Sequence, residues 1–345
     1  MTKNSKSKRY SSSALSKQPS RIQNPVIAIT MGDPGGIGSE VIIKTLRSHR
    51  LTAQCRYVVI GSKAAFSFLQ KKTGLGFSFA DKICSGLQKK KVYFLDIGGD
   101  KFTPAKETVA SGCIALKAIS TAAELAQRGL VQAIVTAPLN KASARLVQKD
   151  FTGHTEFFAK KSGTKQFAMM FVGPKLKLTL ATIHVPLKRV SKLLTANLIF
   201  EKILLTHKTL KQDFGLRAPK IAVCAFNPHG KECGDEEGRV IVPAVKRAFK
   251  KGVRVSGPFP ADTVFHGAYH GVYDAVISMY HDQGLGPFKM VHFHDGVNVT
   301  LGLPYIRTSP DHGTAYDIAY KGKADPASMK AALVLAEKFA INRYG

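Results

Sequence analysis

Short apolar runs that end in polar, glycine-containing loops recur along this chain, and they constrain its fold more than any other feature. The first run covers residues 26–30 and stops at a glycine-rich loop. Beyond that loop, the apolar residues Ile42, Ile43 and Leu46 follow a helical period. Further runs of this kind lie at 57–60, 92–95, 133–136, 221–225, 275–278 and 297–300. Repeated strand and helix units predict the α/β class, with a largely parallel sheet and helices on both faces.

Two segments depart from this alternation. Residues 167–171 and 177–183 flank a turn at Gly173-Pro174, so they predict a local antiparallel pair of strands. Long helical patterns lie at 108–128 and at about 326–342. Many chemically reactive side chains follow the predicted strands directly, and doubly wound sheets bind their ligands at the carboxyl ends of strands. A ligand site is therefore expected there.

The composition narrows the class of protein further. The chain has 345 residues, of which 44% are hydrophobic and 21% are charged, and these values exclude a disordered chain or a fibrous repeat. The length fits two domains or one large α/β unit. No apolar run approaches the roughly 18 residues of a membrane-spanning helix, so no membrane partner is expected. Five cysteines without a CxxC pair favour a reducing, cytoplasmic location.

The formal net charge of +28 raises the question of a nucleic-acid or other anionic partner. Residues 1–24 contain six lysines and arginines and no acid, and they lack the apolar core of a secretory signal. They are predicted to form a disordered basic tail, with a transit-like or anion-binding role as the alternative. The other positive charges are spread along the chain without an evident basic face. Nucleic acid is therefore not the expected partner.

Two predicted helix starts have the character of anion sites. Residues 32–38 join the first strand to a helix with several glycines, which allows close approach of a ligand to the helix N-terminus. Their spacing matches neither the dinucleotide fingerprint nor a phosphate-binding P-loop, so a tight structural turn is an equal alternative. At the second start, Thr155 is a candidate N-cap with neighbouring N–H groups open to an anion, and capping alone is the alternative.

Three histidines directly follow predicted strands: His184, His229 and His281. Three imidazoles gathered at strand ends would form a site for a divalent metal with open positions for substrate oxygen. A hydrogen-bonded structural role for each remains the alternative. Other histidines are assigned to surface or local polar roles: His266, His270, His292 and His294.

Further candidate residues carry charge or amide groups. Lys289, Asn298 and Arg307 lie on successive loops and strands, and lysine and arginine supply the charged donors that a phosphate or carboxylate needs. Asp262, in Pro260-Ala-Asp-Thr263, is either a catalytic carboxylate or a turn residue. Taken alone, each of the first three residues is more often an ordinary surface residue, and an aspartate in such a segment is more often a turn or cap residue.

Six segments taken together resemble the 4-hydroxythreonine-4-phosphate dehydrogenase family, over about residues 25–342. They are residues 32–38, 151–158, 227–230, 260–263, 279–284 and 302–309. The resemblance implies a two-domain fold similar to the isocitrate and isopropylmalate dehydrogenases. Residues 25–345 would form two interleaved α/β subdomains with the active site in the cleft between them, and that site would be shared across a homodimer.

The resemblance also implies an activity, namely the NAD- or NADP-dependent oxidation of 4-phosphohydroxy-L-threonine in pyridoxal 5′-phosphate biosynthesis. One divalent metal (zinc, magnesium, manganese or cobalt) would bind His184, His229 and His281, with one ligand crossing the dimer. The family's substrate contacts map onto His154, Thr155, Lys289, Asn298 and Arg307. Asp262 or Lys289 would transfer protons. Dehydrogenases for D-threonate or D-erythronate 4-phosphate look much the same in these motifs, so that substrate remains the alternative.

A further resemblance concerns the cofactor. Residues 311–326 are similar to the adenine-binding loop of the isocitrate-type dehydrogenases, which usually ends in Asn-Pro. Asp325 stands at the position of that asparagine, so the preference between NAD and NADP stays open. The residues implied to contact the cofactor are His312, Gly313, Thr314, Ala315 and Asp325.

Overall fold

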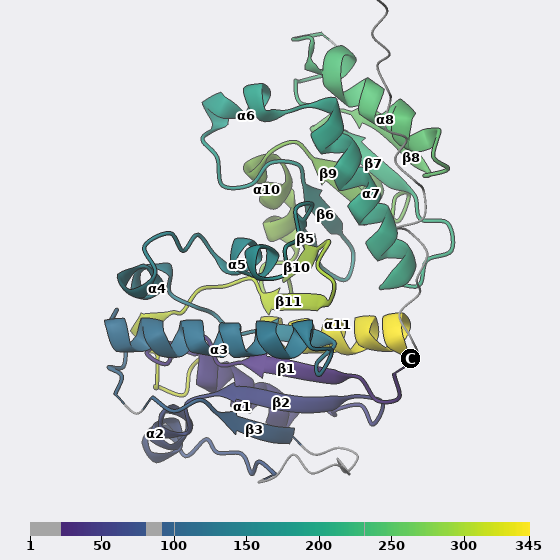
Figure 1. Ribbon diagram of the computed structural model, residues 1–345. Helices are drawn as coiled ribbons and strands as arrows, with labels where there is room; N and C mark the ends of the chain where they lie inside the picture. Colours follow the sequence, from purple (N-terminus) through teal and green to yellow (C-terminus); the bar gives the residue numbers. More distant parts are fainter. Residues whose placement is uncertain (1–21, 81–91, 100, 231) are drawn as a thin grey trace, which may run out of the picture.

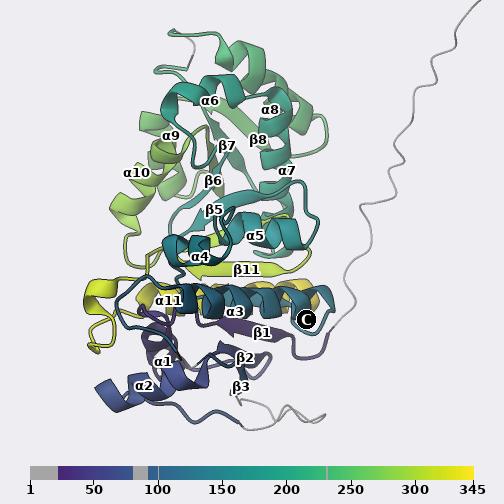
Figure 2. The same ribbon diagram turned by 60° about the vertical axis from the view of Figure 1, so that its left-hand side comes forward.

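The computed structural model describes residues 22–80, 92–99, 101–230 and 232–345. The predicted basic tail lies outside the described residues as far as residue 21. In the described part, eleven strands form one sheet in the order β3-β2-β1-β4-β11-β10-β5-β6-β9-β7-β8. Helices cover both faces of this sheet, as Figures 1 and 2 show. The predicted α/β class is therefore confirmed.

The strands have the following bounds: β1 Val26–Thr30, β2 Arg56–Gly61, β3 Val92–Asp96, β4 Ala133–Thr136, β5 Ala168–Val172, β6 Lys177–Leu180, β7 Ile221–Cys224, β8 Val255–Phe259, β9 Ala275–Ser278, β10 Val297–Leu301 and β11 Ile306–Pro310. The α-helices are α1 Gly38–Ser48, α2 Lys63–Thr73, α3 Val109–Gln127, α4 Lys141–Val147, α5 His154–Lys161, α6 Leu187–Leu193, α7 Ala196–Gln212, α8 Val242–Phe249, α9 Ala261–Tyr269, α10 His281–Val291 and α11 Ala327–Tyr344. A π-helical turn, η2 (Glu237–Ile241), precedes α8, and a 3₁₀ turn, η3 (Tyr316–Ile318), precedes α11.

Most neighbouring strands are parallel, and the exceptions lie at the centre of the sheet. β5 pairs antiparallel with β6 across the predicted Gly173-Pro174 turn, which confirms that expectation. β10 is antiparallel to both β5 and β11. β11 then runs parallel to β4, so the chain rejoins its first strands after it has built the distal part of the sheet.

The path of the chain explains the two ends of the molecule in Figure 1. One end contains β1–β4 with α1, α2 and α3, and the other contains β6–β9 with α6–α10. The C-terminal helix α11 returns to the first end, where it packs against β11, β10 and β4. The side chain of Phe339 in α11 is fully buried and contacts Phe214 at a ring distance of 4.8 Å. β10, β11 and β5 lie between the two ends (Figures 1 and 2).

The buried faces follow from the sequence pattern. All of β1 after its first residue is buried, as expected for a parallel strand covered on both faces. The helix α3 is long and apolar enough to cross a membrane by length and composition alone. More than half of its residues are buried inside the protein, where it packs against β1, β2 and β4. Its apolar character is therefore that of a core helix.

Candidate active site

A cavity of about 460 Å³ lies where β4, β10 and β11 meet the first turn of α5 and one face of α10. Nine of the residues predicted from the sequence line it: His154, Thr155, His184, His281, Lys289, Asn298, Arg307, His312 and Gly313. The remaining predicted residues do not line it: His229, Asp262, Thr314, Ala315 and Asp325. The fold therefore gathers most of the predicted polar groups in one place.

Arg307 is the most unusual group in this cavity. It lies in β11 with only 2% of its side chain exposed, and it forms no ion pair with any described residue. Its guanidinium donates hydrogen bonds to the hydroxyls of Thr136 (2.6 Å) and Thr300 (3.2 Å), whereas its Nε has no partner in the described part of the chain. Burial lowers the pKa of Arg307 to about 9. A buried cation with a free donor at a cavity wall is suited to an anion.

Other buried polar atoms in the cavity also lack partners among the described residues. They are Nε2 of His154, Oδ1 of Asn298 and Nε2 of His312. The His154 ring stacks on Phe158, and burial together with the nearby charge of Arg307 holds the pKa of His154 well below its usual value. The neutral imidazole can donate one hydrogen bond to an anion. Because buried polar groups in proteins are almost always paired, this cluster indicates a polar ligand.

The first turn of α5 contributes to the same wall. The prediction that Thr155 is the N-cap is wrong by two positions, because the N-cap of α5 is Gly153. No side chain of a described residue caps the first N–H groups of this helix. Thr155 is buried instead, and its hydroxyl lies 3.3 Å from that of Thr300 in β10. The free N–H groups of α5 therefore remain available to an anion beside His154.

Lys289 is held at the cavity by a carboxylate that sequence reasoning missed. Its Nζ lies 2.5 Å from Oδ2 of Asp311 and donates a hydrogen bond of 2.9 Å to the carbonyl of the same residue. His281, Leu285 and Lys289 are spaced by four residues along α10, so they share one helix face that lines the cavity. That spacing was visible in the sequence. Burial raises the pKa of the Asp311 carboxyl, while Lys289 opposes this effect.

Two of the three predicted metal ligands lie together. The rings of His184 and His281 are 5.9 Å apart, and burial, followed by the charge of Lys141, lowers the pKa of His184. His281 Nδ1 lies 2.7 Å from a carboxylate oxygen of Asp282, which leaves Nε2 for a ligand bond. An imidazole oriented by a carboxylate, with a second imidazole beside it, fits a divalent transition metal.

One chain, however, does not complete the metal site. In the described ranges, no group of three His, Cys, Asp or Glu side chains is close enough to hold a metal ion. His229 lies on the exposed loop after β7, with a left-handed backbone φ of 55°, and outside the cavity. Catalytic zinc sites usually have three protein ligands, and the His184–His281 pair provides two.

Asp262 is also separate from the cavity. It lies in the first turn of α9, where it is exposed to solvent and can interact favourably with the helix dipole. A single chain therefore does not bring it to the other predicted groups.

The glycine-rich loop at residues 32–38 packs directly against the predicted cofactor segment. The carbonyl of Thr314 accepts a hydrogen bond of 3.0 Å from Ile37 N at the start of α1. A Cβ on Gly36 would lie 2.8 Å from the same carbonyl, so this approach requires glycine. The hydroxyl of Tyr316 donates to the carboxylate of Asp33 at 2.9 Å. Residues 32–38 thus form a tight turn packed against the predicted cofactor segment, and Asp33 and Tyr316 are functional candidates that the sequence did not reveal.

Asp325 lies at the other end of the predicted cofactor segment. Its carboxylate accepts a hydrogen bond of 2.9 Å from the N–H of Ala327, the first residue of α11, whose N-cap is Pro326. The side chain is exposed and lies outside the cavity.

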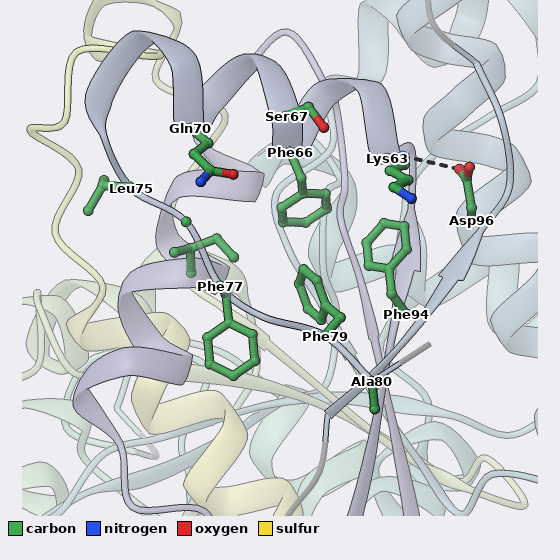
Figure 3. Close-up of a pocket in the computed structure, with 12 residues that line it drawn as sticks. Lys63, Phe66, Ser67, Gln70, Leu75, Phe77, Phe79, Ala80, Phe94 and Asp96 are labelled. Carbon is green, nitrogen blue, oxygen red and sulfur yellow. Dashed lines mark hydrogen bonds between the residues drawn. The ribbon is translucent and has the colours of Figure 1, made fainter. Parts of the chain in front are cut away.

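A second cavity, of about 370 Å³, lies between α2 and β3 (Figure 3). Its walls are formed by the aromatic rings of Phe66, Phe77, Phe79 and Phe94, and it contains none of the predicted site residues. The carboxylate of Asp96 at its edge already accepts the N–H of Lys63 at 3.1 Å. The predicted catalytic groups therefore lie elsewhere.

Comparisons with known proteins first define the class. The fold matches that of a beta-decarboxylating dehydrogenase from Thermococcus kodakarensis, with a TM-score of 0.50, 14% identity and coverage of 90% of this chain and 82% of that chain. At this identity the likeness concerns the fold alone. The class that the fold defines is therefore an α/β architecture built on one large, mostly parallel sheet.

The family follows from closer relatives. The sequence profile of the pyridoxal phosphate biosynthetic protein PdxA matches residues 53–336, and the chain belongs to this family. It is 45% identical to a 4-hydroxythreonine-4-phosphate dehydrogenase from Desulforapulum autotrophicum, over 90% of this chain and 94% of the relative. It is 39% identical to a D-threonate 4-phosphate dehydrogenase from Salmonella typhimurium, over 92% of this chain and 100% of the relative. Members of the family are oxidoreductases.

A solved structure agrees with this assignment. The crystal structure of a 4-hydroxythreonine-4-phosphate dehydrogenase from Klebsiella pneumoniae superposes with a TM-score of 0.83 at 38% identity. The match covers 92% of this chain and the whole of that chain.

Proposed function

We propose that this protein oxidises the C3 hydroxyl of 4-phosphohydroxy-L-threonine with NAD or NADP. The product, 2-amino-3-oxo-4-phosphooxybutanoate, carries a carboxylate β to the new ketone and loses CO₂ to give 3-amino-2-oxopropyl phosphate. This reaction would serve pyridoxal 5′-phosphate biosynthesis in the cytoplasm. The observation that carries the proposal is the buried, unpaired Arg307 beside the free polar atoms of His154 and Asn298.

These residues would bind the substrate's phosphate end. Arg307 supplies the positive charge, His154 a neutral N–H donor, and the uncapped first turn of α5 its backbone N–H groups. The hydroxyl of Thr155 lies in the same turn. Asn298, whose Oδ1 is an acceptor, would receive a hydrogen bond from a substrate hydroxyl or ammonium group. Fixing the phosphate in this way orients the C3 hydroxyl for reaction.

The metal and the nicotinamide supply the redox chemistry when bound: the cation acidifies the substrate hydroxyl as a Lewis acid, and the nicotinamide accepts the hydride. His184 and His281 would hold the cation, which we take to be zinc, magnesium, manganese or cobalt. We propose that His229 of the partner subunit completes the ligand set in a homodimer. The support for this is that His229 is exposed and that the described residues of one chain bring two of the three predicted ligands, His184 and His281, to the cavity.

Lys289 is the better candidate for proton transfer. Its Nζ lines the cavity within reach of Asp311, whereas Asp262 is exposed on α9. After loss of CO₂ the substrate carbon needs a proton, which Lys289 Nζ would donate. Asp262 would act only if the partner subunit's cavity lay against α9.

The cofactor would extend along residues 312–315 toward Asp325. His312 and Gly313 line the cavity directly, and Thr314 and Ala315 lie against the glycine-rich loop. The role of Asp325 in this proposal is to shape the start of α11, where the adenosine part would lie.

A second candidate substrate is D-threonate 4-phosphate. It is favoured by the relatives that bear this name, one of which, from Oceanobacillus iheyensis, is 41% identical over 90% of this chain. The two substrates differ at C2, where one carries an ammonium group and the other a hydroxyl. The phosphate and metal contacts would be the same for both.

A direct comparison of the candidate substrates tests which of them the protein oxidises. Purified protein with a divalent metal and NAD or NADP would be supplied with 4-phosphohydroxy-L-threonine, D-threonate 4-phosphate and D-erythronate 4-phosphate, and formation of the reduced nicotinamide would be followed. We expect the highest kcat/KM with the amino substrate. Turnover of the sugar acids alone would contradict the proposed substrate and establish the second candidate.

A further inference from the structure

A buried carboxylate outside the cavity has an unusual set of partners. Glu237 begins the π-helical turn before α8, and only 1% of its side chain is exposed. Its Oε1 accepts hydrogen bonds from the backbone N–H groups of Phe226 and Asn227, each at 2.8 Å. Its Oε2 accepts one from the side-chain amide of Asn227 at 3.0 Å. Among the described residues it forms no ion pair.

This arrangement fixes the start of the loop that carries His229. Residues 226 and 227 directly follow β7, and His229 comes two residues later with a left-handed backbone. Glu236 also accepts a hydrogen bond from the Asn227 amide, at 2.9 Å, so two successive carboxylates hold one side chain. A π-helical turn is an uncommon conformation that often occurs at functional sites. Burying a carboxylate without a cation costs free energy, and the hydrogen bonds from the loop offset part of that cost.

The same loop is joined to the helix that carries His281. The side chain of Gln283, in the first turn of α10, donates to the carbonyl of Ala225 at 2.7 Å and accepts from Met279 N at 2.7 Å. Ala225 immediately precedes the two N–H groups that bond Glu237. The start of α10 is thus joined by Gln283 to the same backbone segment that Glu237 holds.

We propose that Glu237 is a positioning residue for the metal site: its carboxylate holds the 226–229 loop so that His229 is preorganised before it meets the metal. This inference rests on the proposed function, in which His229 is a metal ligand. Gln283 serves the same purpose from the side of α10. Partners of metal ligands typically contribute a factor of about 10–100 to metal affinity.

Titration with Co²⁺ tests this role without measuring turnover. Full-length wild type and the Glu237→Gln variant would be titrated with Co²⁺, and the visible absorption bands of the bound metal would report affinity and ligand geometry. We expect the Kd for Co²⁺ to rise about 10–100-fold in Glu237→Gln, with altered bands. The matched control is Asp235→Asn, which removes a carboxylate from the same segment that pairs only with exposed Arg239.

The control should keep the wild-type Kd within about twofold. An unchanged Kd and spectrum in Glu237→Gln would overturn the inference, as would an equal loss in Asp235→Asn, because the effect would then be one of charge alone. If Glu237→Gln unfolds in a thermal scan, Gln283→Met provides the second variant, and it should weaken Co²⁺ binding in the same direction. A wild type that binds no Co²⁺ would overturn the proposed function itself.

Discussion

At the scale of single residues, the central feature is a buried arginine that forms no ion pair with a carboxylate in the described part of the chain. The two threonine hydroxyls beside Arg307 satisfy part of its guanidinium, but neither supplies a negative charge. An isolated buried cation costs free energy, and a ligand phosphate would remove that cost. The site therefore has a built-in preference for phosphorylated molecules.

Replacing Arg307 by lysine tests this preference. Lysine keeps the charge but loses the planar fork that bonds two oxygens at once. We expect kcat/KM for the phosphorylated substrate to fall about 10–100-fold, mainly through KM, whereas an unphosphorylated analogue changes little. The control is Arg239→Lys on the exposed turn before α8. An equal loss of kcat/KM for the phosphorylated substrate and the unphosphorylated analogue would show that Arg307 does not bind the phosphate.

The pH dependence of anion binding provides a second residue-scale prediction. Burial lowers the pKa of Arg307 to about 9, so the guanidinium is charged below that pH and loses its proton above it. Only the charged form attracts a phosphate, and a bound phosphate raises the pKa in turn. The affinity for inorganic phosphate should therefore decrease between about pH 8 and about pH 10.

Calorimetric titration across that range measures the decrease directly. In Arg307→Gln the affinity should be low throughout, without the decline. A constant phosphate affinity in the wild type would show that Arg307 stays charged or does not bind the anion.

At the scale of elements, the cofactor segment is held by contacts over a very long sequence separation. Tyr316 and Asp33 are 283 residues apart, yet their side chains are joined where the segment lies on the glycine-rich loop. Burial raises the pKa of both groups, which keeps the tyrosine protonated as the donor. The glycine-rich loop after β1 and the cofactor segment before α11 therefore form one surface, which we call the cofactor platform.

Removing the Tyr316 hydroxyl should loosen that platform. Tyr316→Phe leaves the buried Asp33 oxygen without its donor, at a cost of about 1–3 kcal/mol. We expect the Kd for the reduced nicotinamide, measured by its fluorescence, to rise about fivefold or more, with KM for the phosphorylated substrate unchanged. Tyr269→Phe on the exposed side of α9 is the control. A rise in the substrate KM alone would contradict a role at the cofactor segment.

The sequence predicted most elements because parallel strands buried on both faces are continuous apolar runs. β1, β4, β7 and β9 lie almost where their runs are. The strand β11 was not predicted, because Arg307, Thr308 and Ser309 leave it without an apolar run, and its antiparallel pairing with β10 was therefore not predicted either. The Thr155 cap was predicted wrongly because burial against Thr300 was not visible in the local sequence.

Within the site, the sequence revealed charged and imidazole groups but not their partners. Lys289 was found because it follows a recognisable motif, whereas its partner Asp311 lies 22 residues away on another element. Glu237 was missed for a similar reason, since only the π-helical turn directs its carboxylate to the loop after β7. Pairings that depend on the tertiary fold leave no local pattern.

At the scale of the whole molecule, the proposed metal site requires two chains. His184 and His281 share a cavity within the chain, and His229 lies on an exposed loop. A homodimer with twofold symmetry would give two equivalent sites, each containing residues of both subunits.

Mixing inactive subunits tests this arrangement. His184→Ala and His229→Ala should each abolish turnover, because each removes a ligand from both sites of the dimer. After unfolding and refolding together in equal amounts, half of the dimers are mixed and each has one intact site, so activity should recover to about a quarter of wild type. No recovery, despite mixed dimers in native mass spectrometry, would show that each site is built within one chain.

The most direct test of the proposed function is the metal dependence of 4-phosphohydroxy-L-threonine oxidation. Formation of the reduced nicotinamide would be measured with the purified protein, after chelation, and again after addition of Zn²⁺, Mg²⁺, Mn²⁺ or Co²⁺. We expect turnover to be lost on chelation and restored by at least one of these metals. Undiminished turnover by the fully chelated protein would contradict the proposed role of the three histidines.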